Sequence, residues 1–470
     1  DRAAGALVGL AAGDALGAGY EFESVVPDPP RMIGGGLGGW DPGEWTDDTQ
    51  MAVCIAEVTA SGSVDLAAIG GQFLYWYGGH PPDVGNQTRA VLGAYRSGDD
   101  LTAIAAAHYE RNPRNAAGNG SLMRTAPVAL AHLGDDQAIA GAAMAVSVLT
   151  HGDPLAGEAC VLWCIAIDRA VREGRLDGVT DGLDLLPAPA RDRWTRLLEV
   201  AETTEPESFT ANGFVVTALQ AAYSAIVHTP IPNDDMPCVH LQRSLERAVR
   251  IGNDTDTVAA IAGQLLGARW GASAVPIKWR AMLHGWPGYR SRDLSRLAIL
   301  TARGGEPDAA TGWPGAEHLV PFYRERDGAS GRIVALPDDP GVRIGDAASV
   351  SEASGSDVVL SLCRMGWSDV PEGVEHHETW LIDVAGAEHN PNLEFMLRDL
   401  ASAIAGWRDE GRPVLVHCVR AESRTPTVAA AYLCDRFGLS GSDALARVRE
   451  VLPGARPNAG FRSALERIWP

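Results

Sequence analysis

The stretch GALVGLAAGDALG, residues 5–17, carries glycine at every fourth position. A second stretch, GNDTDTVAAIAGQLLGARWG at residues 252–271, repeats this spacing with Gly263, Gly267 and Gly271. On a helix, residues four apart lie along one face. Glycine in a helix costs about 1 kcal/mol per site relative to alanine, so a compensating contact is expected. The pattern therefore predicts helices that approach their neighbours closely and bring residues at the helix ends together.

The spacing of apolar residues changes along the chain. Through roughly the first 300 residues they recur every three to four positions, which is typical of helices. Residues 301–330 are rich in Gly, Pro and charge and have no sustained period. Beyond them, the short runs GVRIGD, DVVLSLC, TWLIDV and PVLVHC alternate with helical patterns, which indicates a largely parallel sheet covered by helices. We expect an all-α domain at 1–305, a linker at 306–329 and an α/β domain at 330–470.

Length and composition limit the class of protein. The 470 residues exceed the roughly 250–300 that one core usually holds, so two domains are expected. The charge sum, 39 − 60 = −21, repels phosphate backbones and anionic membranes and argues against general nucleic-acid binding. No apolar run of about 18 residues exists, so no membrane span is expected, and the N-terminal segment lacks the features of a secretion signal. The seven cysteines are scattered along the chain, which favours reduced thiols in a cytoplasm. The high content of Ala, Gly, Pro and Arg indicates a GC-rich, bacterial gene.

Two acidic clusters stand near opposite ends of the helical region. WTDDTQ holds Thr46, Asp47 and Asp48, and NDTDT holds Asp254 and Asp256. Carboxylate and hydroxyl oxygens are the ligands that Mg²⁺ and Mn²⁺ prefer. The clusters lie 254 − 47 = 207 positions apart, and if the fold joins them, their repulsion requires one or two cations. The same residues also fit ordinary helix starts, because Asp, Thr and Asn cap helix N-termini.

Six strings of the helical region occur in a characteristic order: GLAAGDALGAGYEF (9–22), WTDDTQMA (45–52), PPDVGNQTRAVL (81–92), GNGSLMRTAPVAL (118–130), THGDP (150–154) and GNDTDTVAAIAGQLLGARWG (252–271). Together they resemble the ADP-ribosylglycohydrolase family, which includes the dinitrogenase reductase-activating glycohydrolase. The resemblance covers roughly residues 1–300. It implies an all-helical fold, two divalent cations (Mg²⁺ or Mn²⁺) and cleavage of the glycosidic bond at the anomeric carbon of ADP-ribose.

The resemblance implies a role for each matching position. The implied metal ligands are Thr46, Asp47, Asp48, Asp254, Asp256 and Thr257. Glu21 matches an acid near the metal centre and is implied to be catalytic, as are Asp47 and Asp256. The implied substrate-binding residues are Gly118, Asn119, Gly120 and Ser121 at the diphosphate and ribose, His151 at the phosphates, and Asp83 at the leaving group.

The chemistry agrees with these roles. Departure from the anomeric carbon creates oxocarbenium character, which carboxylates stabilise. A metal pair polarises ribose hydroxyls and activates a bound water, whose proton Glu21 can accept. Asp83 can hold a guanidinium leaving group by charge-assisted hydrogen bonds, and glycine amides can approach phosphate oxygens. His151 fits a buried core histidine equally well on sequence alone.

A second constellation lies in RPVLVHCVRAESRTPTVAAAYL at 412–433. It places a strand, Cys418, five residues, Arg424 and a helical pattern in that order. A strand–loop–helix unit directs successive amides at one point on a helix N-terminus, which binds anions and favours a thiolate. Residues 330–470 resemble the dual-specificity branch of the cysteine phosphatases.

This second resemblance implies Cys418 as the nucleophile and Arg424 as the clamp for a phosphate group. Asp383, 35 positions before the cysteine (418 − 383), matches the general acid, with Glu388 as the weaker candidate for that role. Thr425 is placed to hydrogen-bond the thiolate when it leaves.

The phosphate loop departs from the family pattern at two positions. Ala421 replaces a usual glycine, although glycine alone adopts positive φ at little cost. Glu422 puts a negative charge in a loop that binds anions, unless its side chain turns outward. A folded, phosphate-binding module with poor catalysis therefore stands as an alternative to an active phosphatase.

We expect a two-domain enzyme that removes ADP-ribose from a protein side chain or a small ADP-riboside, with a phosphorylated substrate for the second domain. Two alternatives remain open at this stage. One is a non-catalytic reader of ADP-ribose and phosphate, and the other is a protein whose main activity is the C-terminal phosphatase.

Overall fold

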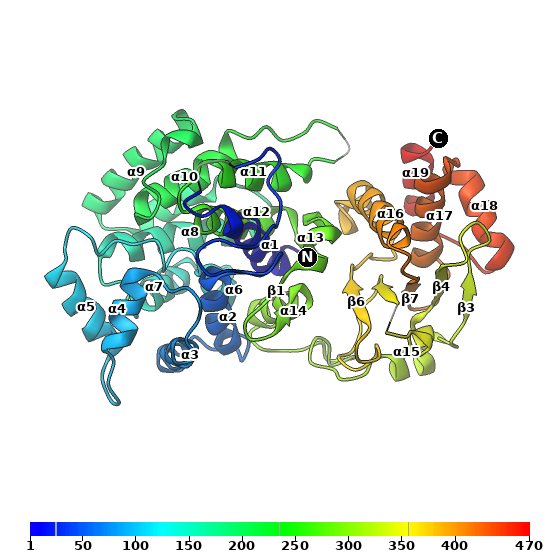
Figure 1. The fold of residues 1–470 in the computed structure, drawn as a ribbon, viewed down its shortest axis with the longest axis horizontal. Coiled ribbons are helices and arrows are strands. Elements are labelled where there is room, and N and C mark those ends of the chain that lie inside the picture. Colours follow the sequence, from blue (N-terminus) through cyan, green and yellow to red (C-terminus); the bar gives the residue numbers. More distant parts are fainter. Residues whose placement is uncertain (24–25, 235, 356) are drawn as a thin grey trace. The chain divides into compact units, whose positions relative to one another are not determined.

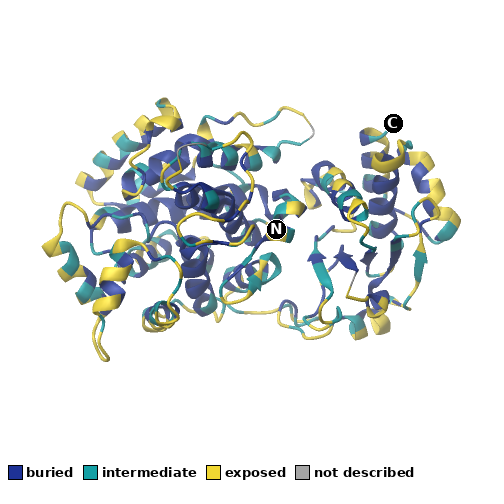
Figure 2. Cartoon of the chain, viewed as in Figure 1, coloured by how far each residue is buried: buried dark blue, intermediate teal, exposed yellow. Residues whose placement is uncertain are grey.

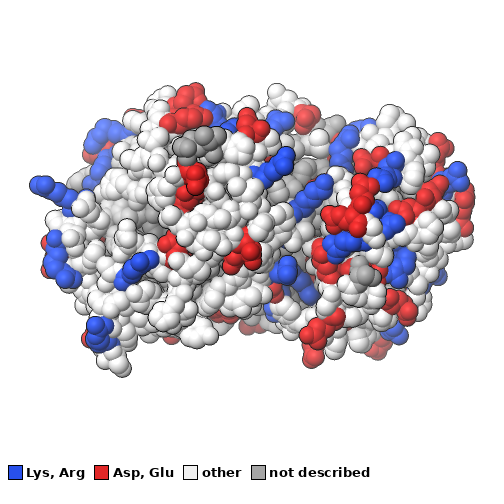
Figure 3. All heavy atoms as spheres, viewed as in Figure 1, with Lys and Arg blue, Asp and Glu red and all other residues white. Residues whose placement is uncertain are grey.

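The computed structural model describes residues 1–23, 26–234, 236–355 and 357–470 (Figure 1). The chain divides into two compact units. The first comprises residues 1–232 and 237–306, and the second comprises residues 307–470 with the short segment 233–236. Within the described parts of the chain, no helix is both long and apolar enough to cross a membrane. Acidic and basic side chains are interspersed on the face drawn in Figure 3.

The first unit is built almost wholly from helices, as the apolar periodicity predicts. One short antiparallel hairpin, β1 (His284–Gly285) and β2 (Tyr289–Arg290), interrupts them. The helices are α1 (Arg2–Gly17), α2 (Asp47–Thr59), α3 (Leu66–Gly78), α4 (Asn86–Ala94), α5 (Leu101–Arg111), α6 (Ala126–Ala131), α7 (Asp136–Ser147), α8 (Pro154–Glu173), α9 (Ala188–Thr203), α10 (Val215–Val227), α11 (Val239–Arg250), α12 (Thr255–Trp270), α13 (Ile277–Met282) and α14 (Ser291–Ala302).

Helices α1 and α12 form the centre of this unit, and nearly every residue of both is buried (Figure 2). Their glycines face each other across the contact. A Cβ added at Gly9 would lie 2.3 Å from the carbonyl oxygen of Gly263, and one added at Gly263 would lie 2.0 Å from that of Gly9. At Gly13 the corresponding distance to the Ala259 carbonyl oxygen is 2.0 Å. The two backbones therefore touch directly, as the glycine spacing predicts.

The order of these contacts shows that α1 and α12 run antiparallel. Gly5 faces Gly267 near one end of the pair, whereas Gly17 faces Asp256 at the other. The Thr255 hydroxyl also donates to the carbonyl oxygen of Gly17 at 2.9 Å. The last turn of α1 is thus held against the first turn of α12, although more than two hundred residues separate them along the chain.

The second unit is a five-stranded sheet packed with helices, as the alternating pattern predicts. The strand order is β3-β4-β7-β5-β6, in which only β3 is antiparallel to its neighbour. The strands are β3 (Ile333–Ala335), β4 (Val342–Asp346), β5 (Val358–Ser361), β6 (Glu375–Glu378) and β7 (Val414–Cys418). The helices are α15 (Val320–Asp327), α16 (Leu393–Asp409), α17 (Arg424–Phe437), α18 (Gly441–Val451) and α19 (Ala459–Ile468). Helices α16 to α19 pack against one another.

One strand expectation was wrong. The run TWLIDV at 379–384 is not a strand; the strand of this region is β6, which ends at Glu378. β6 has the sequence EHHE and lies at the edge of the sheet, where one of its two sides pairs with no strand of the described chain. Polar residues are therefore tolerated there, and an apolar run is a poor guide to its position.

The backbone contact between α1 and α12 makes a direct prediction. Gly9→Ala places a methyl group against a carbonyl oxygen, so the helices must separate, and we expect a loss of about 1–3 kcal/mol in the free energy of unfolding. The matched control is Gly71→Ala on the exposed side of α3, where a Cβ meets nothing within 4 Å. That change should stabilise the protein by up to about 1 kcal/mol.

Urea unfolding followed by circular dichroism measures both effects. Equal stabilities for the two variants would contradict the close contact.

Candidate active sites

Five carboxylates of the first unit converge on one buried place. One oxygen from each of Asp14, Asp48 and Asp256 lies within 4.8 Å of the others, and the same holds for Glu21, Asp254 and Asp256. We call these five residues the acidic centre. Because Asp256 belongs to both groups, the centre is continuous. The two clusters of the sequence therefore meet in space.

Helix ends supply most of the acidic centre. α2 begins at Asp47, directly after Thr46, whose hydroxyl accepts a hydrogen bond from the Asp48 amide at 3.4 Å. α12 begins directly after Asp254. Both helix N-termini point positive dipole ends at the carboxylates, which favours negative charge there. The helix-start interpretation and the metal-site interpretation of these strings therefore describe the same residues.

Glu21 reaches the centre through the loop that follows α1. The Phe22 amide donates to the carbonyl oxygen of Asn253 at 2.8 Å, which ties this loop to the residue before Asp254. Phe22 and Asn253 both have positive φ, at 55° and 60°, so the backbone turns sharply on both sides of this bond. The turn brings Glu21 beside the start of α12.

Asp14 is the member of the centre that the sequence reasoning missed. It lies inside the glycine-rich helix α1, is fully buried, and accepts hydrogen bonds from the Thr46 amide at 2.9 Å and the Thr49 amide at 3.0 Å. The Thr49 hydroxyl adds a third bond at 2.5 Å. Asp14 thus fixes the first turn of α2 against α1. Its position inside an apolar helix with regularly spaced glycines was the sequence feature that could have indicated its role.

The donor set fits a hard divalent cation. The hydroxyls of Thr46 and Thr257 both donate to Asp48 Oδ2, at 3.1 and 3.3 Å. Asp48 Oδ1 and Glu21 Oε2 are buried and lack a hydrogen-bond partner within the described residues. Buried carboxylate oxygens without donors are costly, and oxygen-only sites suit Mg²⁺ or Mn²⁺.

The electrostatics point the same way. Burial raises the pKa of Asp48 and of Asp256 well above the ordinary value, and the neighbouring carboxylates add to both shifts. Burial also raises the pKa of Asp254. Burial, followed by the charges of Asp254 and other acids, raises the pKa of Glu21 to about 8. Ionised together, these groups repel strongly, and a cation is the natural counter-charge.

Asp47 lies outside the two groups of the acidic centre. Its Oδ2 accepts from the Gly85 amide at 3.3 Å, so it faces the segment that begins with Asp83. Burial, and next the charge of Asp83, raise the pKa of Asp47 to about 7. Asp83 itself is half-buried, and its side chain accepts from the Val84 amide at 2.7 Å. These two acids form a second, neighbouring pair.

The glycine loop 118–121 is bonded to the acidic centre. Asn119 donates from its amide nitrogen to Asp254 Oδ2 at 2.8 Å and to the Asn212 carbonyl oxygen at 2.9 Å. The Ser121 hydroxyl accepts from Ser147 at 2.9 Å. His151 lies behind the loop, where a Cβ added at Gly120 would be 3.1 Å from its Cε1 atom. The loop and the acidic centre are therefore directly connected through Asn119.

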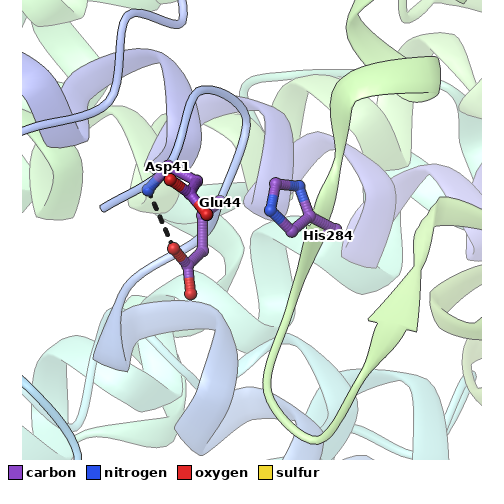
Figure 4. A group of neighbouring side chains, drawn as sticks. All are labelled: Asp41, Glu44 and His284. Carbon is purple, nitrogen blue, oxygen red and sulfur yellow. Dashed lines mark hydrogen bonds between the residues drawn. The ribbon is translucent and has the colours of Figure 1, made fainter. Parts of the chain in front are cut away.

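A third group of side chains shares no residue with the acidic centre. Asp41, Glu44 and His284 place one ligand atom each within 4.8 Å of one another (Figure 4). Glu44 accepts from the Asp41 amide at 2.9 Å, and His284 Nδ1 bonds the Met282 carbonyl oxygen at 2.8 Å. Glu44 and His284 also line a cavity of about 500 Å³, together with the indole rings of Trp40, Trp76 and Trp286.

In the second unit, Cys418 ends β7 and Arg424 begins α17, so the five intervening residues form a tight loop. The Arg424 guanidinium donates to the carbonyl oxygens of Leu362 at 3.2 Å and Leu381 at 3.3 Å. Its Nε is buried without a hydrogen-bond partner in the described chain and lies 3.9 Å from Asp383 Oδ2. The hydroxyl of Thr425 donates to the Gly345 carbonyl oxygen at 3.4 Å, and no bond from it to Cys418 is found among the described residues.

Asp383 is fixed beside this loop. It accepts from the Ser423 hydroxyl at 2.6 Å and from the Asn458 side-chain amide at 2.9 Å. Glu388, the weaker candidate, is largely exposed, and its carboxylate lies 3.6 Å from His389 Nε2. Of the two acids, only Asp383 is bonded to the loop that contains the cysteine.

The two departures in the loop have structural counterparts. Ala421 adopts φ of +58°, the left-handed conformation for which glycine is better suited. Glu422 pairs with Arg420 at 2.9 Å and with Arg456 at 3.5 Å. Its charge is thus matched by two exposed arginines instead of being left alone in the loop.

Fold and site together define a helical domain with a buried carboxylate centre, followed by a small α/β unit with a cysteine–arginine loop. Residues 1–308 match the family model described as ADP-ribosylglycohydrolase, and residues 355–468 match that of the dual specificity phosphatase catalytic domain. The chain belongs to the ADP-ribosylglycohydrolase family. Both resemblances stated from the sequence are confirmed.

Individual relatives cover the helical unit. ADP-ribosylarginine hydrolase Tri1 of Serratia proteamaculans is 30% identical over 291 residues, which is 59% of this chain and 74% of the relative. ADP-ribosyl-dinitrogen reductase glycohydrolase of Rhodospirillum rubrum is 30% identical over 290 residues, 60% of this chain and 90% of the relative. A solved structure entitled ADP-ribosylglycohydrolase-related protein complex is 30% identical with a TM-score of 0.53, and covers 65% of this chain and 98% of its own.

The raised pKa values make a prediction for the metal-free protein. Asp14, Asp47 and Glu21 titrate at about 6, 7 and 8 in the folded state, above the values near 4 of an unfolded chain. The unfolded state therefore binds fewer protons in this window, and stability present below about pH 4 is lost as the pH rises to about 8. In EDTA, the melting temperature of the wild type should fall further between about pH 5 and pH 8 than that of Asp48→Asn, because this substitution removes one charge from the acidic centre.

Circular dichroism melts at the two pH values measure the difference. The control is Asp192→Asn, an exposed aspartate on α9, which should follow the wild type. A pH dependence that is the same in wild type and Asp48→Asn would contradict the repulsion.

Proposed function

We propose that the helical unit hydrolyses the glycosidic bond between ADP-ribose and an acceptor, with two divalent cations, Mg²⁺ or Mn²⁺, at the acidic centre. The observation that carries the proposal is the meeting of two aspartate clusters, 207 positions apart, beside a glycine-rich loop that is bonded to one of them. Family membership supports hydrolysis of an ADP-ribose linkage. An arginine side chain is the proposed acceptor, because two relatives are named ADP-ribosylarginine hydrolases.

The cations would be held by Thr46, Asp48, Asp254, Asp256, Thr257 and Glu21, with Asp14 anchoring the first turn of α2 behind them. Asp47, which the sequence also predicts as a metal ligand, lies beside Asp83 next to the acidic centre and would bind a cation from that side. When bound, such cations supply Lewis acidity to ribose hydroxyls and to a water molecule.

The remaining steps belong to side chains of this protein. The amides of the 118–121 loop would bind the diphosphate, since glycines let phosphate oxygens approach the backbone. Carboxylates of the acidic centre would stabilise oxocarbenium character at the anomeric carbon. Glu21 would accept the proton of the attacking water once bound cations favour its ionised form, because without them burial and the neighbouring acids raise its pKa to about 8. Asp83 would hold the departing guanidinium by charge-assisted hydrogen bonds.

We also propose that the second unit is a cysteine-dependent phosphatase. The Cys418 thiolate would attack phosphorus, the bond from phosphorus to the leaving oxygen would break, and Asp383 would give that oxygen its proton. Water would then attack phosphorus and give its proton to Asp383, the sulfur–phosphorus bond would break, and inorganic phosphate and the Cys418 thiolate would be released. Support comes from the position of Asp383, bonded to Ser423 inside the loop and 3.9 Å from Arg424.

Asp256→Asn tests the first activity. Asp256 belongs to both groups of carboxylates, so its loss should lower ADP-ribose release from an ADP-ribosylarginine peptide by about 10²–10⁴-fold. Asp192→Asn on the exposed side of α9 serves as the matched control and should retain wild-type turnover. Absence of release by the wild type with Mg²⁺ or Mn²⁺ would favour a non-catalytic reader of ADP-ribose.

Cys418→Ser tests the second activity. Hydrolysis of an aryl phosphate should fall by at least about a thousandfold, because the nucleophile is removed while the loop remains. Cys434→Ser, a buried thiol on α17, is the matched control. Phosphatase activity that survives Cys418→Ser would require a different nucleophile.

A further inference from the structure

A buried arginine stands behind the glycine loop. Arg124 is fully buried and pairs with no carboxylate among the described residues. Its guanidinium lies over the Phe73 ring at 4.3 Å and approaches Met51 Sδ at 3.1 Å. Its one bond to an oxygen goes to the Thr150 hydroxyl, at 2.6 Å. A buried cation with so few partners is costly, so a further role for it is expected.

The bond to Thr150 has only one possible direction. A guanidinium has hydrogen-bond donors and no acceptor, so the Thr150 oxygen accepts from Arg124. Thr150 is itself fully buried and its hydroxyl hydrogen needs an acceptor. Within the described chain, the acceptor that lies in reach is Nδ1 of His151, at 2.8 Å. Thr150 therefore donates to His151, and the Nδ1 atom carries no proton.

His151 is held in its neutral form. Burial, and next the charge of Arg124, lower its pKa well below the ordinary value of histidine. A neutral imidazole without a proton on Nδ1 carries it on Nε2. The chain of bonds from Arg124 through Thr150 thus selects one tautomer.

The Nε2 atom of His151 faces the glycine loop. Cβ atoms added at Gly118 and Gly120 would lie 3.5 and 3.2 Å from it. His151 is 1% exposed, and its ring is held by the bond from Thr150 to Nδ1, which leaves Nε2 on the side of the loop. The Nε2–H group is thus aimed at the loop whose Asn119 is bonded to the acidic centre.

We propose that Arg124 is a positioning residue, which acts through Thr150 to present His151 as a neutral Nε2–H donor to an oxygen of the ADP-ribose moiety at the glycine loop. The inference deepens the proposed function and rests on it for the identity of the ligand. The donor is uncharged, so it recognises an acceptor oxygen by direction instead of by net charge. If a group with only acceptors stood in place of Arg124, the Thr150 hydroxyl could donate to that group. His151 could then carry its proton on Nδ1.

The test compares Thr150→Val, which removes the hydroxyl at nearly constant shape, with Thr150→Ser, which keeps it. Nitrogen-15 NMR of the histidine-labelled full chain reports the tautomer, with His151 assigned from its loss in His151→Gln. We expect protonated Nε2 and bare Nδ1 in the wild type and in Thr150→Ser. In Thr150→Val the Nδ1 resonance should shift, and ADP-ribose affinity measured by calorimetry should fall about tenfold.

The wild-type spectrum alone shows which ring nitrogen of His151 carries the proton, independently of the variants. A proton on Nδ1, or a charged imidazolium at neutral pH, would overturn the proposal. So would Thr150→Val with wild-type ADP-ribose affinity. Failure of the proposed function gives a different result: the wild type would release no ADP-ribose from any ADP-riboside, while the tautomer of His151 would remain as stated.

Discussion

The helical unit depends on one contact, the backbone-to-backbone packing of α1 against α12. Glycines on both helices make it possible, because any side chain there would overlap a carbonyl oxygen of the partner. Antiparallel packing then fixes the end of α1 beside the start of α12. Asp14 extends the arrangement to α2 by binding its first turn. Three helix ends are thereby held together, and the carboxylates of the acidic centre meet there.

This arrangement keeps carboxylates that repel one another close together in a buried site. Burial and mutual repulsion raise the pKa values of the acidic centre, and two carboxylate oxygens there have no hydrogen-bond partner in the described chain. Nearby, the cationic Arg124 is buried without a carboxylate partner among the described residues, and hydrogen bonds connect it through Thr150 to His151. Both features place unbalanced polar groups around the glycine loop, as a site that completes itself by binding cations and an anionic ligand would require.

The sequence alone predicted the parts that have a simple period or a dense cluster. The glycine stripes predicted close helices because a close contact is needed to offset their cost. The two aspartate strings stood out because each places two carboxylates and hydroxyl groups within a few residues. Asp14 was missed because a single acid in an apolar helix has no pattern of its own. The polar edge strand Glu375–Glu378 was missed because its residues are not apolar. Arg124 and the bond of Thr425 to Gly345 depend on contacts between distant segments, which no local spacing reveals.

Manganese binding to the full chain, followed by electron paramagnetic resonance, tests the central claim most directly. The account predicts two Mn²⁺ ions per chain whose spins are coupled, because the two carboxylate groups share Asp256. Asp256→Asn should abolish the coupling while leaving the fold intact. A wild-type chain that binds no Mn²⁺, or that binds isolated ions indifferent to Asp256→Asn, would contradict the account.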